Sequence, residues 1–93
     1  MGLRFKWDSR KAAANNQKHG VSFREAITAF DDPLSITIAD PEHSAGEQRY
    51  VLVGASHRGR LLVVAHTDRG DTIRIINARP ATRHERKAYE EES

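Results

Sequence analysis

The sequence of 93 residues contains no cysteine, only 3 prolines and few aromatic side chains. Without cysteine the chain can form no disulfide and offers no thiolate nucleophile, which suits a reducing compartment. No apolar run approaches the roughly 20 residues that cross a membrane, and the N-terminal residues do not resemble a secretory signal. We therefore expect a cytoplasmic protein with no membrane partner.

The motifs of several enzyme classes are also missing. The sequence has no Walker loop, no glycine-rich dinucleotide turn and no nucleophile elbow. Its 5 histidines include no pair three or four residues apart, the spacing at which one helix face holds zinc. The sequence therefore predicts neither a metal site nor a cofactor.

The length allows one domain with one small core. Hydrophobic residues make up 38% of the chain and charged residues 30%, which suits a folded rather than a disordered protein. No internal repeat or low-complexity linker divides the sequence, so we expect a single domain over residues 1–93.

Basic side chains are distributed unevenly along the chain. Nine of them stand against three acidic ones between positions 49 and 87, although the net charge of the whole chain is only +2. The planar guanidinium group binds phosphate through two parallel hydrogen bonds, and a basic surface attracts polyanions. This pattern indicates a nucleic-acid partner, and a solvated face of scattered arginines is the alternative.

Apolar periodicity predicts an α+β fold in the order β-α-α-β-β-β-β-α, with a mainly antiparallel sheet. The expected strands span residues 3–7, 34–39, 49–55, 60–67 and 72–77. The expected helices span residues 9–19, then from a cap at Ser22 to a break at 31–33, and finally from about 80 to 91.

The helix ends carry specific signals. Asp8 can cap the first helix, and Gly20 fits the position after its end. Ser22 and Glu25 have the spacing of a capping box for the second helix. The last helix is polar nearly all round, so we expect it to overlie a charged site or to be held by a partner, and a loose position on the surface is the alternative.

RNA cleavage without a metal ion needs a base, an acid and cations that stabilise the charge on phosphorus. The chain offers these groups as arginines, histidines, glutamates and a late tyrosine. Arg74 lies inside an apolar strand, where an unpaired charge is costly. It either forms an ion pair, for instance with Glu47 or Glu85, or belongs to an anion site with Arg60 and Arg79.

Several segments, taken together and in order, resemble the signature of the BrnT toxins. They are Phe5-Lys6-Trp7-Asp8, Lys11, Asn15, Lys18-His19-Gly20-Val21-Ser22-Phe23, Glu25-Ala26, Asp31-Asp32-Pro33, His43-Ser44, Glu47, Arg49, Gly59-Arg60, Arg74-Ile75-Ile76-Asn77-Ala78-Arg79, Glu85-Arg86 and Tyr89. The resemblance covers nearly the whole chain. It implies a RelE-like fold and a metal-independent endoribonuclease toxin of a type II toxin–antitoxin system, which lowers translation.

The resemblance also implies partners and site residues. The expected partners are the RNA substrate and a BrnA-type antitoxin, which carries a DNA-binding domain and joins the toxin in a heterotetramer. The predicted catalytic residues are Arg60, Arg74, Arg79, Tyr89, Glu47 and His19. The predicted RNA-binding residues are Lys18, Arg49, Arg83 and Arg86.

Structural roles are open for three of these residues. His19 can instead hydrogen-bond the last carbonyls of its helix, Glu47 can pair with Arg49, and Tyr89 can be a packing residue. The alternative function for the whole chain is a non-catalytic basic module that binds RNA or protein.

Overall fold

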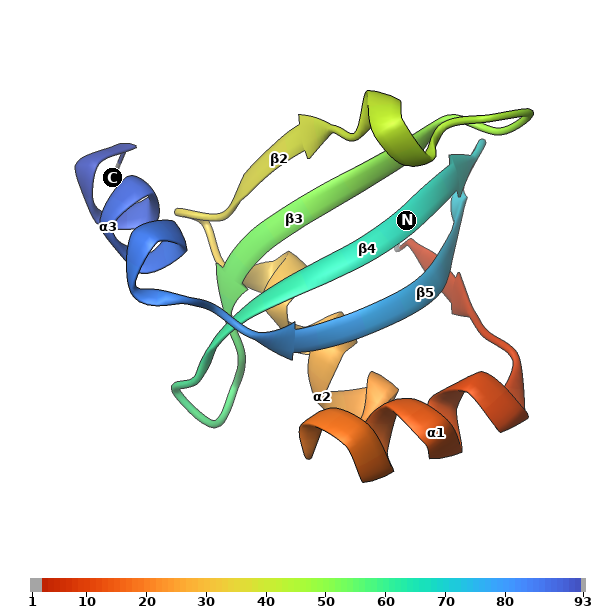
Figure 1. Cartoon of the computed structure of the whole chain (residues 1–93), viewed down its shortest axis with the longest axis horizontal. Coiled ribbons are helices and arrows are strands. Elements are labelled where there is room, and N and C mark those ends of the chain that lie inside the picture. The colour runs from red at the N-terminus through yellow and green to blue at the C-terminus, as the bar shows by residue number, and fades with distance from the viewer. Residues whose placement is uncertain (1–2, 93) are drawn as a thin grey trace.

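The computed structural model describes residues 3–92. A five-stranded sheet is flanked by two N-terminal helices on one face, and a C-terminal helix stands beside the sheet at one end (Figure 1). The strands are β1 (Arg4–Lys6), β2 (Ile36–Ala39), β3 (Arg49–Ala55), β4 (Leu61–Arg69) and β5 (Thr72–Pro80). The helices are α1 (Ser9–His19), α2 (Phe23–Thr28) and α3 (Arg83–Glu92), with 3-10 turns at Ala29–Asp31 and Pro41–His43.

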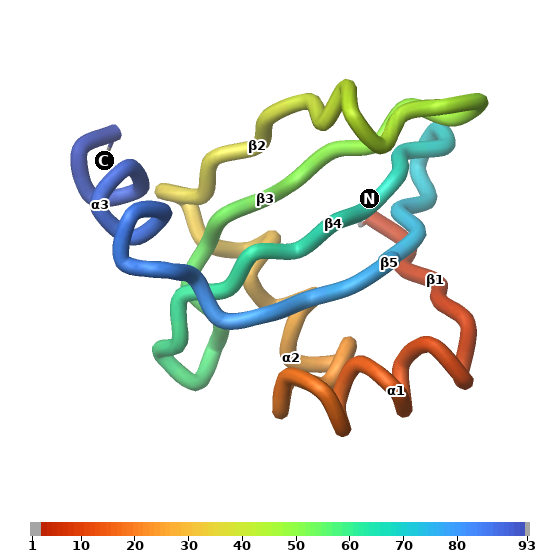
Figure 2. Tube along the Cα trace, in the orientation of Figure 1, coloured from red at the N-terminus to blue at the C-terminus, as the bar shows by residue number. Residues whose placement is uncertain are grey.

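The strands lie in the order β1-β5-β4-β3-β2. β1 runs parallel to β5, and the other three pairs are antiparallel. Figure 2 shows how the chain passes from β1 through α1 and α2 before it returns to the sheet through β2. The predicted α+β class and the order β-α-α-β-β-β-β-α are therefore confirmed.

The ends of α1 follow the sequence closely. The Asp8 carboxylate accepts hydrogen bonds from the backbone N–H groups of Arg10 and Lys11 at 2.8 and 3.1 Å. Gly20 ends the helix with φ 67°, and its N–H donates to the Asn16 carbonyl. This left-handed backbone favours glycine, so the turn after His19 is fixed by the sequence itself.

The core lies between the sheet and the two N-terminal helices. Val21, Phe23 and Ala26 pack against Leu62 and Val64. Ile73, Ile75 and Ala78 of β5 complete the buried cluster. These contacts show that α1 and α2 cover one face of the sheet. We call the opposite face the distal face.

The boundary between the last strand and the last helix differs from the prediction. β5 continues to Pro80 because Val63 and Leu62 of β4 pair with Arg79 and Pro80. The helix then begins at Arg83, where the Thr82 hydroxyl accepts a hydrogen bond from Glu85 N–H and the Glu85 carboxylate accepts one from Thr82 N–H. This reciprocal pair is a capping box, and it starts α3 three residues later than predicted. No helix within residues 3–92 is long and apolar enough to cross a membrane.

Candidate functional site

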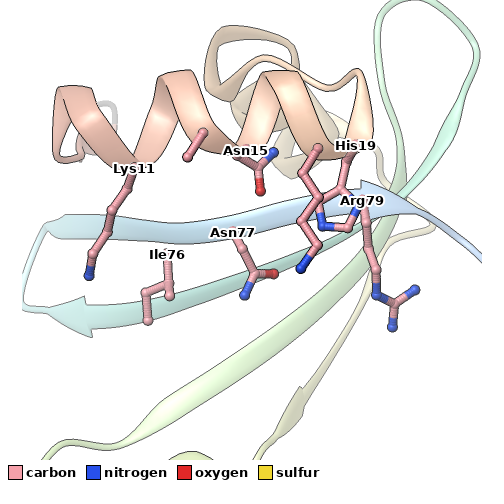
Figure 3. Close-up of a pocket in the computed structure, with 8 residues that line it drawn as sticks. Lys11, Asn15, His19, Ile76, Asn77 and Arg79 are labelled. Atoms are coloured by element: carbon pink, nitrogen blue, oxygen red, sulfur yellow. The ribbon is translucent and has the colours of Figure 1, made fainter.

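A cleft with a volume of about 380 Å³ lies between α1 and the edge of β5. β1 pairs with β5 only at residues 72–74, so beyond this point α1 lies beside β5 instead of a neighbouring strand. The residues that line this edge cleft are Lys11, Ala14, Asn15, Lys18, His19, Ile76, Asn77 and Arg79 (Figure 3).

Asn15 holds α1 against the open edge of β5. Its buried amide nitrogen donates to the carbonyls of Val21 and Ala78 at 2.9 and 2.8 Å. Its amide oxygen accepts a hydrogen bond from Ala78 N–H at 3.0 Å. The side chain thus replaces a neighbouring strand, and it satisfies backbone groups that a bare edge would leave unpaired. Asn15 therefore holds the two sides of the cleft together, and its amide hydrogen bonds go to the backbone rather than to a ligand.

The helical side of the edge cleft is basic. Lys11 and Lys18 are seven residues apart, two turns along α1, so they lie on the same face of the helix. His19 is half-buried at the end of α1, and Figure 3 shows its ring near Arg79 at one end of the cleft with Lys11 toward the other. Within residues 3–92, neither lysine has an ion-pair partner, and the His19 ring makes no hydrogen bond to the last helix carbonyls. These groups are available to a ligand.

Arg79 on β5 joins the edge cleft to α3. Its two terminal nitrogens donate to the two carboxylate oxygens of Glu85, both at 2.7 Å. The Arg79 guanidinium lowers the pKa of Glu85 to about 2. Glu85 therefore occupies two of the five N–H donors of Arg79 and offsets its positive charge toward any approaching anion.

α3 is anchored at a second point by Tyr89. Its hydroxyl donates to the Asp32 carboxylate at 2.5 Å, which raises the pKa of Tyr89 to about 12. Asp32 also accepts hydrogen bonds from the N–H groups of Leu34 and Ala55. Asp32 thus joins α3 to the start of β2 and the end of β3. Its position at the predicted end of the second helix did not indicate this role.

Arg60 lies on the covered face, away from Arg74. Its Nε donates to the Glu25 carboxylate at 2.9 Å, and one terminal nitrogen donates both to Glu25 at 2.5 Å and to the Gly20 carbonyl at 3.0 Å. Glu25 is 3% exposed, and Arg60 holds its pKa at about 2. Arg60 and Arg74 therefore do not share one anion site, which was one of the two alternatives for Arg74, because the two side chains lie on opposite faces of the sheet.

The Arg60–Glu25 pair fixes the turn that follows α1. Glu25 also accepts a hydrogen bond from the Ser56 hydroxyl at 2.7 Å. Only one of the two hydrogen bonds of the capping box predicted for α2 is formed within the described residues. The Ser22 hydroxyl accepts from Glu25 N–H, whereas the Glu25 carboxylate binds Ser56 and Arg60 instead of Ser22 N–H. Arg60 thus links Glu25 of α2 to the Gly20 carbonyl, one residue beyond His19.

The other predicted site residues are dispersed. Glu47 pairs with Arg69, through Nε at 2.6 Å, rather than with Arg49 or Arg74. Arg49 and Arg74 lie on the distal face on either side of Thr67. Arg83 and Arg86 are exposed on α3. The edge cleft thus brings together Lys18, His19 and Arg79 from the predicted set.

The structure adds residues to the site that the sequence did not single out as site residues. Lys11 and Asn77 line the edge cleft with His19, and the seven-residue spacing of Lys11 and Lys18 was the available signal. His66, one of the histidines that the chain offers for proton transfer, is buried against Phe30 with ring centroids 4.9 Å apart, and burial lowers its pKa. It lies in the core rather than in the cleft.

These features define a small α+β protein whose basic cleft suits a polyanion. Residues 7–85 match the family described as ribonuclease toxin, BrnT, of type II toxin–antitoxin systems. The match spans most of the chain, so the protein belongs to the BrnT family of ribonuclease toxins.

A solved structure supports the fold assignment. The chain is similar to the crystal structure of the Brucella abortus ribonuclease toxin BrnT, with a TM-score of 0.68 and 18% sequence identity. The alignment covers 87% of this chain and 99% of the other. No curated protein sequence matches the chain.

Proposed function

We propose that this protein is a metal-independent endoribonuclease that cleaves RNA in the edge cleft and thereby inhibits translation. Membership of a family of ribonuclease toxins supports the reaction class. The observation that carries the assignment is the edge cleft itself, where His19 lies with Lys11, Lys18 and Arg79. An imidazole among three cations has the parts that phosphodiester cleavage requires.

The proposed reaction begins with attack of a ribose 2′-hydroxyl on the adjacent phosphorus. His19 takes the proton from the 2′-hydroxyl, because imidazole is a side chain suited to proton transfer. The bond from phosphorus to the 5′-oxygen then breaks, and His19 returns the proton to that oxygen, which leaves a 2′,3′-cyclic phosphate and a 5′-hydroxyl. Lys18 and Arg79 stabilise the negative charge that develops on the phosphoryl oxygens. Lys11, at the other end of the cleft, binds a neighbouring phosphate.

The remaining predicted residues support this site at a distance. Arg60 positions the turn after α1, and Tyr89 holds α3, which carries Glu85 against Arg79. Glu47 orients Arg69. Arg83 and Arg86 extend the positive surface along α3, and Arg49 and Arg74 do so on the distal face.

The membership of a type II toxin family implies a cognate antitoxin. We propose that this partner is a BrnA-type protein with a DNA-binding domain, and that toxin and antitoxin form a heterotetramer. The edge cleft is basic on its helical side, so an antitoxin segment that occupies it excludes RNA.

Growth on induction tests the toxin function. We expect the wild-type chain to stop growth with loss of total RNA, and co-expression of the antitoxin to restore growth. His19→Ala is expected to abolish arrest, whereas Arg24→Ala, which removes an exposed arginine on α2, is expected to leave it intact. A folded wild-type protein that binds RNA in a salt-dependent manner but causes neither arrest nor cleavage supports the binding module instead.

A further inference from the structure

A second basic cluster lies on the distal face, at the end of the sheet where β1 joins β5. Lys6 pairs with Arg74, Arg74 with Thr67, and Thr67 with Arg49. These four residues therefore form one row across four adjacent strands. At a spacing of about 4.8 Å between strands the row is roughly 14 Å long.

The orientation of the row follows from its neighbours in sequence. Phe5 and Ile73 pack with the helices, as do Ile75 and His66. Because side chains alternate along a strand, the row residues beside them face the other way. A hollow of about 170 Å³ lined by Lys6, Arg69, Thr72 and Arg74 is consistent with this arrangement.

The charges of the row are not balanced by carboxylates. Arg69 is paired with Glu47, and Arg4 lies 4.0 Å from Asp71. In contrast, Lys6, Arg49 and Arg74 have no ion-pair partner in the part of the chain that the structure describes. Like charges on neighbouring strands are destabilising, so this concentration of cations favours a bound anion.

Thr67 supplies an independent observation at the centre of the row. It is 1% exposed, and its hydroxyl oxygen has no hydrogen-bond partner among residues 3–92. A buried hydroxyl without a partner costs free energy. Its two cross-strand neighbours are Arg49 and Arg74, so an anion held between these arginines can accept a hydrogen bond from the hydroxyl once their side chains turn toward the ligand.

We propose that Lys6, Arg49 and Arg74, arranged around Thr67, form a phosphate-binding subsite for the RNA backbone outside the edge cleft. This inference rests on the proposed function, because it takes RNA as the ligand. β5 connects the two places, since Arg74 belongs to the row and Arg79 to the edge cleft. Five residues of strand span about 16 Å, so one RNA strand that follows β5 reaches both.

Binding of a 2′-O-methyl RNA oligonucleotide, which lacks the attacking hydroxyl, tests the subsite without interference from cleavage. The double variant Arg49→Gln/Arg74→Gln is expected to bind about tenfold more weakly. The slope of log affinity against log salt is expected to fall by about 1.4, because each phosphate contact to a single strand contributes about 0.7.

The matched control is Arg10→Gln/Arg24→Gln, which removes the same charge from exposed arginines on α1 and α2. Arg49→Lys/Arg74→Lys keeps the charge and should retain the wild-type slope, which separates a lost contact from a damaged fold. Thr67→Val is expected to weaken binding about threefold, and equal affinity contradicts the assignment of its hydroxyl.

The two proposals fail in different ways. If the glutamine double variant binds with the affinity and slope of the control pair while the wild type cleaves RNA, the subsite is wrong and the ribonuclease proposal stands. If the double variant shows the expected loss but the wild type cleaves no RNA, the subsite stands and the ribonuclease proposal is wrong.

Discussion

Arg79 lines the edge cleft and also binds Glu85 of α3. Both of its terminal nitrogens donate to Glu85, so the carboxylate occupies two of the five N–H donors and offsets the positive charge that attracts a phosphate. The same ion pair that fixes the direction of the guanidinium therefore opposes binding of RNA, the substrate that we propose. Such a contact adjusts affinity for the substrate while it preserves the geometry of the site.

Replacement of Glu85 by glutamine should reveal this opposing effect. Glu85→Gln retains an oxygen for the cap at Thr82 but removes the charge, so we expect 2′-O-methyl RNA to bind several-fold more tightly. Glu91→Gln removes the same charge from an exposed position on α3 and serves as control. Equal affinity of the two variants in a fluorescence titration contradicts this effect.

We expect replacement of Arg60 to lower the stability of the fold, because Arg60 binds the buried Glu25 carboxylate. Arg60→Ala leaves the buried Glu25 carboxylate without its main partner, and we expect the melting temperature to fall by roughly 5–10 °C. Arg58→Ala removes an exposed guanidinium 3.7 Å from the same carboxylate and should cost much less. Similar melting temperatures of the two variants, measured by circular dichroism, contradict the positioning role.

The lowered pKa values predict how stability depends on pH. Arg60 and Arg79 lower the pKa values of Glu25 and Glu85 from 4.5 to about 2. The stabilisation is therefore fully present above about pH 4.5 and is lost as the pH falls toward 2. In Glu25→Gln the denaturation midpoint should change less with pH across this range. A midpoint that falls equally steeply in the variant contradicts the assignment.

At the scale of elements, α3 is a polar helix attached by few contacts. Its capping box fixes its start, and Glu85 and Tyr89 bind Arg79 and Asp32. Between the helix and the sheet lies an apolar cleft of about 450 Å³ whose lining includes Ile36 and Ile38. The helix is thus held by polar contacts at Glu85 and Tyr89 rather than by a filled core.

Tyr89→Phe tests this attachment. The change removes the hydroxyl that donates to Asp32, a contact worth about 1 kcal/mol. We expect amide hydrogen exchange in α3 to accelerate about fivefold. Tyr50→Phe removes a hydroxyl from a ring that stacks on His66 in the core and should leave α3 unchanged. Equal protection of α3 in both variants contradicts the anchor.

The elements also show what the sequence can and cannot predict. The ends of α1 were predictable because Asp8 and Gly20 act on adjacent backbone. The boundary between β5 and α3 was not predictable from the sequence, because Pro80 also suits the first turn of a helix. Its place in the strand depends on pairing with β4. Alternation likewise placed Arg74 opposite Ile73 and Ile75, but it did not show which face the helices cover.

At the scale of the whole molecule, the basic surface is divided between the edge cleft and the distal face. Sequence resemblance identified the family, which residues 7–85 confirm. It did not predict that Asn15 binds Ala78, 63 residues away, or that the cleft depends on this contact. Long-range contacts of this kind arise from packing and leave no local signal.

Single-turnover cleavage of an RNA oligonucleotide by the purified protein shows whether the edge cleft carries the reaction. We expect the wild type and Arg24→Ala to cleave at similar rates, and His19→Ala to cleave about 10²–10⁴-fold more slowly. Arg79→Ala should also be strongly impaired, because it removes a cation from the site of charge development. A folded His19→Ala variant that cleaves at the wild-type rate would show that the edge cleft is not where the reaction occurs.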